Sequence, residues 1–140
     1  MPELESNGSC LCGTVSIGGT FGESVGACHC DICRAWGGGP LLALDGGVDL
    51  HVSDPSSVTV FGSTDWAERG FCSKCGTHLY IRVKGSGRYI VPAGLFDLDN
   101  ELNFDHQIFV DKRPSYYCFA NETKNMTGEE VFAQFMSGDA

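Results

Sequence analysis

Six consecutive residues, Cys28-His29-Cys30-Asp31-Ile32-Cys33, constrain the fold of this chain most, because they carry three thiols at C-x-C-x-x-C spacing. A disulfide within so short a segment is disfavoured, since bridged Cα atoms lie roughly 4.4–6.8 Å apart with a defined torsion. Three thiolates can instead turn inward around one zinc ion, which prefers four ligands in a tetrahedron. Cys28, Cys30 and Cys33 then fill three corners, and the open fourth corner is typical of a site that binds or transforms a ligand.

Two readings of this trio remain open from spacing alone. In the first, the fourth corner is free for a substrate. In the second, a further protein ligand, most simply His29 or Cys118, closes the site and makes it structural. Cys118 lies between Tyr117 and Phe119, however, and a free cysteine often behaves as a small buried apolar residue. We therefore expect Cys118 to belong to the core.

Four other cysteines form two close pairs, a C-x-C (Cys10, Cys12) and a C-x-x-C (Cys72, Cys75). The simplest partition joins the two pairs in one structural zinc site with a filled tetrahedron. Such a site offsets the entropy of closing a long loop of chain. In a rival partition the trio takes a ligand from one pair and leaves the other site incomplete. Iron–sulfur clusters also use four thiolates, but the sequence favours zinc, at two ions per chain.

Length and charge limit the classes of function. The 140 residues suit one domain, which we expect over 8–140, after a flexible leader over 1–7. The net charge of −9 disfavours nucleic acids and anionic membranes as partners. No secretion signal and no run of about 18 apolar residues is visible. We therefore predict a cytoplasmic protein, in which cysteines are ligands or nucleophiles more often than bridges.

The pattern of the chain predicts a mainly β fold. Its 19 glycines indicate many short strands joined by tight turns, among them turns at Gly18-Gly19 and Asp45-Gly46-Gly47. Residues 78–84 alternate, with Leu79, Ile81 and Val83 on one face. Thr127 and Glu130 match a capping box. They predict a short C-terminal helix that packs through Val131, Phe132, Phe135 and Met136 and ends at Gly138.

The segment that follows the trio, residues 34–40, holds three glycines and a proline and is not expected to form regular structure. Its bare backbone would allow a ligand to approach, although an ordinary turn explains it equally well. Arg34, Gly37, Gly38 and Gly39 are the candidate substrate contacts.

These motifs resemble the glutathione-dependent formaldehyde-activating enzymes and their centromere-protein-V relatives. The resemblance covers roughly residues 7–118 and rests on the cysteine pattern, on Arg69-Gly70-Phe71 before Cys72, and on Ala93-Gly94-Leu95-Phe96-Asp97. It implies a β-tent fold of antiparallel sheets stapled by zinc. It also implies a structural zinc on the four paired cysteines and an exchangeable zinc on Cys28, Cys30 and Cys33. The chain departs from the family at Gln107, where histidine is frequent.

The activity that the resemblance implies is that of a carbon–sulfur lyase or synthase, which forms S-hydroxymethylglutathione from a glutathione-type thiol and formaldehyde or a similar small electrophile. Two alternatives come from other classes: a non-catalytic zinc protein that binds glutathione or another thiol, and a structural or interaction module in which both zinc ions are inert.

Overall fold

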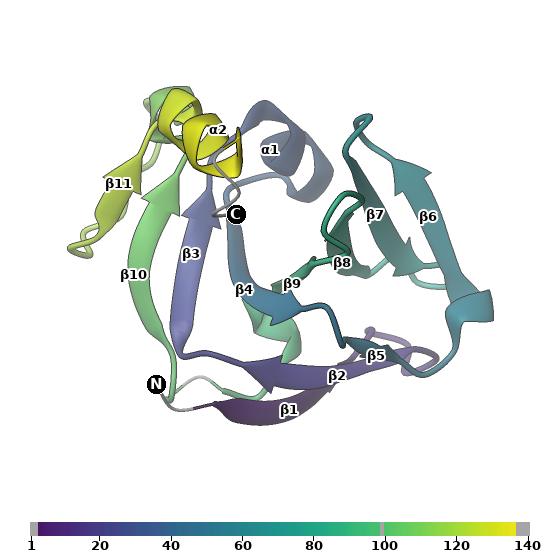
Figure 1. The fold of residues 1–140 in the computed structure, drawn as a ribbon. Helices are drawn as coiled ribbons and strands as arrows, with labels where there is room; N and C mark the ends of the chain where they lie inside the picture. Colours follow the sequence, from purple (N-terminus) through teal and green to yellow (C-terminus); the bar gives the residue numbers. More distant parts are fainter. Residues whose placement is uncertain (1–2, 99, 137–140) are drawn as a thin grey trace. The chain divides into compact units, whose positions relative to one another are not determined.

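The computed structural model describes residues 3–98 and 100–136 and is mainly β, as the sequence predicts (Figure 1). The chain divides into two compact units. Unit 1 comprises Met1–Glu23 and Ala43–Leu102, and unit 2 comprises Ser24–Leu42 and Asn103–Ala140. Each unit is thus built from two separate stretches of sequence, and each is described on its own below.

Unit 1 holds two antiparallel arrangements of strands. A small sheet has the order β1-β2-β5, and the larger arrangement runs β4-β9-β8-β7-β6. Its strands are β1 (Leu4–Ser9), β2 (Ser16–Phe21), β4 (Leu41–Gly47, from Ala43 onward), β5 (His51–Val52), β6 (Val58–Gly62), β7 (Ala67–Cys72), β8 (His78–Val83) and β9 (Tyr89–Pro92). Two 3-10 turns, η1 (Pro55–Ser57) and η2 (Ala93–Leu95), complete the unit.

Apolar side chains from both arrangements form the core of unit 1. The predicted inner face of β8 is confirmed, because Leu79, Ile81 and Val83 are all buried. The rings of Phe21 and Phe96 lie with their centroids 4.6 Å apart. This packing fixes the end of β2, the strand that follows the first pair of cysteines.

Three local predictions for unit 1 are wrong. Residues 4–7 of the leader expected over residues 1–7 belong to strand β1, and this strand pairs with β2 along its whole length. The expected turn at Gly18-Gly19 lies inside β2, and Asp45-Gly46-Gly47 lies inside β4. All three have the same physical reason. The hydrogen bonds between strands use backbone groups only, so polar or glycine-rich segments can form strands when a partner strand is present.

Unit 2 is organised around three parallel strands in the order β11-β10-β3, which lie side by side in Figure 1. They are β3 (Ser24–Cys28), β10 (Asn103–Ile108) and β11 (Lys124–Met126), accompanied by α1 (Asp31–Gly37), η3 (Val110–Lys112) and α2 (Gly128–Met136). The expectation of antiparallel sheets therefore holds for unit 1 but not for this unit. Parallel pairing brings the end of β3 beside residues more than 75 positions later.

Helix α1 replaces most of the irregular segment that the glycines predict. Arg34 to Gly37 are helical, and only Gly38 takes the left-handed conformation that ends the helix, with φ 86°. The Gly38 amide donates to the Arg34 carbonyl at 2.8 Å. A left-handed glycine just past the last turn is a common way to end a helix, so these glycines end a helix instead of preventing it.

The C-terminal helix α2 begins at the predicted capping box. The Thr127 amide donates to Glu130 Oε1 at 2.9 Å, and the Glu130 amide donates to Thr127 Oγ1 at 3.2 Å. Phe132 is exposed on one side but packs edge-on against Phe109, with ring centroids 5.7 Å apart. The side chains of Phe135 and Met136, and Gly138, lie outside the described residues.

Candidate metal centres

The four paired cysteines lie on two tight turns of unit 1. Cys10 and Cys12 follow β1, whereas Cys72 ends β7 and Cys75 precedes β8. In each turn a glycine amide closes the loop: Gly13 donates to the Cys10 carbonyl at 3.0 Å, and Gly76 donates to the Cys72 carbonyl at 2.9 Å. Both glycines have positive φ, 81° and 78°. A side chain would be strained there, which explains why a glycine follows each pair.

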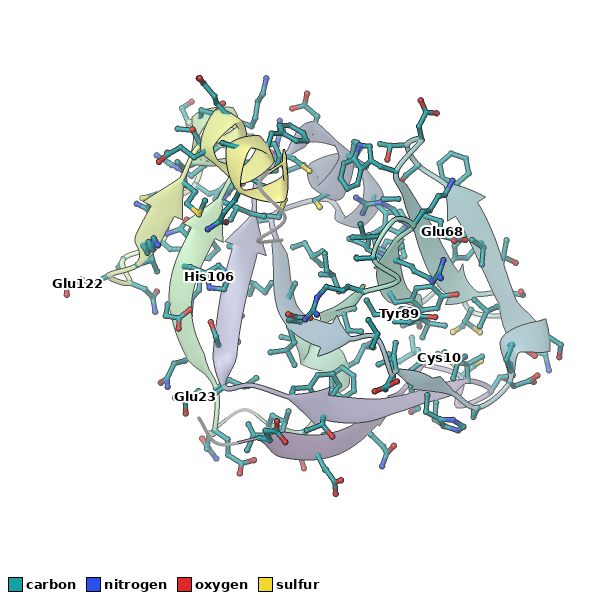
Figure 2. All side chains as sticks on the ribbon, viewed as in Figure 1. Cys10, Glu23, Glu68, Tyr89, His106 and Glu122 are labelled. Atoms are coloured by element: carbon teal, nitrogen blue, oxygen red, sulfur yellow. The ribbon has the colours of Figure 1, made fainter. Side chains whose placement is uncertain are left out.

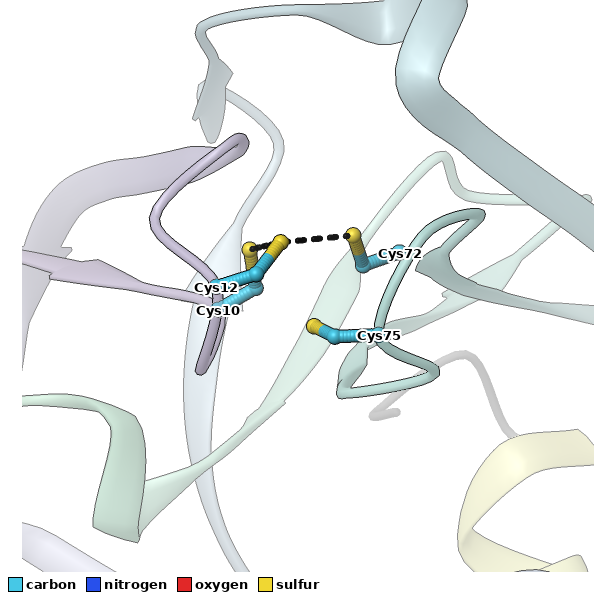
Figure 3. Close-up of side chains that lie close together, drawn as sticks. All are labelled: Cys10, Cys12, Cys72 and Cys75. Carbon is cyan, nitrogen blue, oxygen red and sulfur yellow. Dashed lines mark hydrogen bonds between the residues drawn. The ribbon is translucent and has the colours of Figure 1, made fainter.

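The four sulfur atoms of this quartet (Cys10, Cys12, Cys72, Cys75) all lie within 4.8 Å of one another. Figure 3 shows the side chains directed toward a common centre, with sulfur–sulfur distances of 3.6 Å for Cys10–Cys12 and 3.8 Å for Cys12–Cys72. A zinc–sulfur bond of about 2.3 Å implies tetrahedral edges of about 3.8 Å, whereas a disulfide needs about 2.05 Å. The donor set therefore fits a four-thiolate zinc site.

Neighbouring hydroxyl groups favour the thiolate forms of Cys12 and Cys75. The Thr14 hydroxyl lies 3.2 Å from Cys12 Sγ and lowers the pKa of that thiol. The Thr77 hydroxyl lies 3.1 Å from Cys75 Sγ and, as the largest contribution, lowers the pKa of Cys75 to about 5. The Val15 amide donates to Cys10 Sγ at 3.3 Å. Thiolates are the metal-binding form of cysteine, so these two threonines favour metal binding at Cys12 and Cys75.

The trio (Cys28, Cys30, Cys33) forms a second, separate cluster in unit 2. Its sulfur atoms also lie within 4.8 Å of one another. Cys28 ends β3, Cys30 caps α1, and the buried Cys33 lies in the first turn of that helix. The Cys30 sulfur accepts the Cys33 amide at 3.3 Å. Sharing of hydrogen bonds among the sulfurs, first with Cys28, lowers the pKa of Cys30 to about 2, and the bond to Cys30 raises the pKa of Cys28.

Neither of the two protein ligands considered for the fourth corner joins the trio. His29 is fully buried, and both of its ring nitrogens are taken, Nδ1 by the Tyr117 hydroxyl at 2.7 Å and Nε2 by Gln107 Oε1 at 2.8 Å. Cys118 is exposed, so its expected place in the core is wrong. Across residues 3–98 and 100–136, the group of metal-binding side chains at this point contains the three cysteines.

Arg34 and the glycines lie directly after the trio along α1. The Arg34 guanidinium donates from Nε to the His29 carbonyl at 3.0 Å and from Nη2 to Asp31 at 2.9 Å. Its side chain is 26% exposed. Gly37 and Gly38 are exposed, and a Cβ added at Gly37, Gly38 or Gly39 would meet no atom within 4 Å. These residues thus follow the trio directly in the sequence, and the structure leaves space around the glycines.

Three residues around the trio had no clear signal in the sequence. Gln107 on β10, Tyr117 and Thr123 join His29 in a chain of hydrogen bonds. Gln107 stands out in the sequence only as a departure from a family pattern, and Tyr117 only as a neighbour of Cys118. Their contact with His29 depends on the parallel pairing of β3 with β10, which cannot be inferred from spacing.

None of the helices in the described part of the chain has the length and apolar character needed to cross a membrane.

Known proteins resemble this chain in fold and in sequence. A crystal structure of a Rhodobacter sphaeroides protein is similar in fold, with a TM-score of 0.56 and 23% identity, over 65% of this chain and 87% of that one. An uncharacterized lyase of Schizosaccharomyces pombe is 37% identical over 133 residues, which is 94% of this chain and 96% of the relative. A Halomonas elongata protein provisionally named a glutathione-dependent formaldehyde-activating enzyme is 34% identical over 84 residues, 53% of this chain and 54% of that protein.

The family model of the glutathione-dependent formaldehyde-activating enzymes matches residues 5–112, a span that contains both cysteine clusters. By this match and by its relatives, the chain belongs to the glutathione-dependent formaldehyde-activating enzyme family.

Proposed function

We infer that this protein is a zinc-dependent carbon–sulfur lyase or synthase that adds a glutathione-type thiol to formaldehyde or a similar small electrophile, and catalyses the reverse reaction. The observation that carries the proposal is the trio of sulfurs in unit 2, which is separate from the quartet and has three protein ligands among the described residues. The family and the names of the relatives, a lyase and a formaldehyde-activating enzyme, support the same chemistry.

Cys28, Cys30 and Cys33 would hold the zinc, which when bound supplies a fourth corner that lowers the pKa of a substrate thiol from about 8.5. The quartet would hold a second zinc that fixes the fold of unit 1. In the reaction, the thiol loses its proton, and its sulfur forms a bond to the carbonyl carbon. The electron pair of the carbonyl π bond moves to oxygen, which takes up a proton and becomes the hydroxyl of a hydroxymethyl thioether. The reverse reaction breaks the same carbon–sulfur bond.

Arg34 is the residue proposed to bind a carboxylate of the thiol substrate. Its bond to the His29 carbonyl holds the guanidinium of the residue that directly follows Cys33 in α1. A substrate carboxylate would compete only with Asp31, whose side chain is 73% exposed, and an exposed ion pair of this kind contributes little free energy. The open backbone at Gly37, Gly38 and Gly39 would leave room for the rest of the peptide.

The test combines metal analysis, binding and turnover. We expect two zinc ions per wild-type chain, glutathione binding by calorimetry, and faster exchange between glutathione and its hydroxymethyl adduct by NMR than in buffer alone. Cys33→Ala should lose one zinc, the binding and the exchange, whereas Cys118→Ser, a matched change at an exposed thiol, should keep all three. Glutathione binding without faster exchange would favour a thiol-binding module, and a wild-type chain with one zinc would refute the proposal.

We also propose a reducing compartment such as the cytoplasm, because all eight cysteines are free and seven of them lie in the two clusters. Thiol ligands of this kind must stay reduced to bind a metal. The net charge of −9 argues against nucleic acid as the partner.

A further inference from the structure

A continuous chain of hydrogen bonds runs through unit 2 from Tyr117 to strand β11. The Tyr117 hydroxyl lies 2.7 Å from His29 Nδ1, and His29 Nε2 lies 2.8 Å from Gln107 Oε1. Gln107 Nε2 donates to Thr123 Oγ1 at 2.9 Å, and Thr123 Oγ1 donates to Asn125 Oδ1 at 2.6 Å. We call these five residues the His29 relay. It joins the segment of the trio to three separate parts of the chain.

The donors and acceptors of three hydrogen bonds in the relay can be assigned in sequence from Asn125 back to His29. The Asn125 oxygen can only accept, so the Thr123 hydroxyl donates to it and accepts from the Gln107 amide nitrogen. The Gln107 oxygen must then accept from His29, which places the ring proton on Nε2. His29 Nδ1 shares its hydrogen bond with the Tyr117 hydroxyl at the other side of the ring. The relay thus holds each ring nitrogen of His29 against a fixed partner, with a proton on Nε2.

The position of His29 connects the relay to the metal centre. His29 stands between two members of the trio, Cys28 and Cys30, and its ring is 0% exposed. Its backbone is held too, because its amide donates to the Ile108 carbonyl at 3.2 Å and its carbonyl accepts Arg34 Nε at 3.0 Å. Cys28 and Cys30 are the direct neighbours of His29 in the chain. A rotation of the His29 backbone would therefore reorient both sulfur atoms.

We propose that Tyr117 and Gln107 are positioning residues for the second metal centre: by clamping the His29 ring at both nitrogens, they hold Cys28 and Cys30 in the arrangement that a metal ion needs. The proposal rests on the proposed zinc site at the trio. Groups that orient metal ligands through hydrogen bonds typically change metal affinity 10–100-fold when removed. The relay acts here through the residue between two ligands instead of through a ligand itself.

Two variants each remove one end of the clamp. Tyr117→Phe deletes the hydroxyl and keeps the ring that stacks on His29 at a centroid distance of 5.5 Å. Gln107→Met removes the acceptor of the Nε2 proton and keeps a side chain of similar length. The matched control is Tyr116→Phe, which deletes the hydroxyl of the adjacent tyrosine, 75% exposed. The quartet in unit 1 is an internal reference in every variant, because none of the changed residues belongs to that unit.

The first readout is the affinity of each zinc, measured by competition with a chelator. We expect Tyr117→Phe and Gln107→Met to weaken the more labile zinc about 10–100-fold and to leave the tighter one unchanged, while Tyr116→Phe changes neither. The second readout is the nitrogen NMR shifts of His29. They should show a proton held on Nε2 in the wild type and values that move toward averaging between the two ring nitrogens in the two clamp variants.

The possible failures are distinct. Unchanged affinity for the labile zinc in both clamp variants overturns the proposal and leaves the zinc site standing. A wild-type His29 that samples both tautomers overturns it as well. A wild-type chain that binds a single zinc refutes the proposed function, and with it the metal-positioning role, even if the His29 shifts still report a clamped ring. A variant that loses both zinc ions equally has lost its fold, and this result counts against a local role.

Discussion

The quartet makes a quantitative prediction about the stability of the zinc-loaded protein. Cys12→Ser combined with Cys75→Ser removes one ligand from each pair and leaves two sulfurs, too few for a tetrahedral site. The buried Cys10 and Cys72 stay in place, so the apolar packing of the turns is kept. Cys12 and Cys72 are 60 residues apart in sequence. A cross-link that closes a loop of this length stabilises a chain by about 4 kcal/mol through the entropy of the unfolded state.

We therefore expect the double variant to lose about 4 kcal/mol of unfolding free energy, roughly a thousandfold in the ratio of folded to unfolded protein. This loss is a large share of the unfolding free energy of a typical domain, about 5–15 kcal/mol. Urea unfolding of the zinc-loaded proteins measures it, with Cys118→Ser as the control for the same chemical change at an exposed thiol. A strong chelator should lower wild-type stability similarly. A loss below about 1 kcal/mol, or a wild type indifferent to the chelator, would refute the cross-link.

Further predictions concern local structure. Gly26→Ala should lower the unfolding free energy in a urea titration by about 1–3 kcal/mol, because the added Cβ would lie 2.1 Å from Nε2 of His106. Figure 2 labels His106 on β10. The control is Gly94→Ala, whose Cβ would meet no atom within 4 Å and which should leave the unfolding free energy unchanged. Thr127→Ala should cost about 1 kcal/mol and speed amide exchange in α2, since it removes the cap, and unchanged exchange would contradict the box. Burial, and then the charge of Arg69, lower the pKa of His78. As pH falls below about 6.5, the unfolded state therefore binds a proton more readily than the folded state, and the unfolding free energy decreases. This decrease should be smaller in His78→Gln. Equal pH profiles of stability in the variant and the wild type would contradict this role of His78.

The cysteine clusters were the most predictable part of the site, because close spacing within a segment forces sulfur atoms together whatever the fold. Spacing therefore indicates the trio and each of the two pairs, and the structure joins the pairs into one group and brings the sulfurs of each group within 4.8 Å of one another. The inner face of β8 was equally visible, since Leu79, Ile81 and Val83 alternate with residues of the opposite face. The close spacing of cysteines and the alternation in β8 are both local patterns of side chains, whereas the joining of the two cysteine pairs across 60 residues is not local.

Features that depend on distant backbone partners were not predictable. Strand β1 is polar and exists because β2 pairs with it. Helix α1 begins at a cysteine whose sulfur accepts an amide proton, a capping role usually filled by serine, threonine, aspartate or asparagine. The contacts of His29 with Gln107 and Tyr117 join residues 78 and 88 positions apart. No spacing rule links such residues before the parallel strands of unit 2 are known.

The interleaved course of the chain also has a consequence for biosynthesis. A ribosome that adds about 5–20 residues per second exposes Cys72 some 3–12 s after Cys12. By the end of that interval the thiols at positions 28, 30 and 33 have emerged, whereas Gln107 and Tyr117 follow later in the sequence. A nascent chain therefore presents three loose thiols before either cluster is complete, and for the proposed zinc site the order of translation predicts early, reversible capture of the ion there.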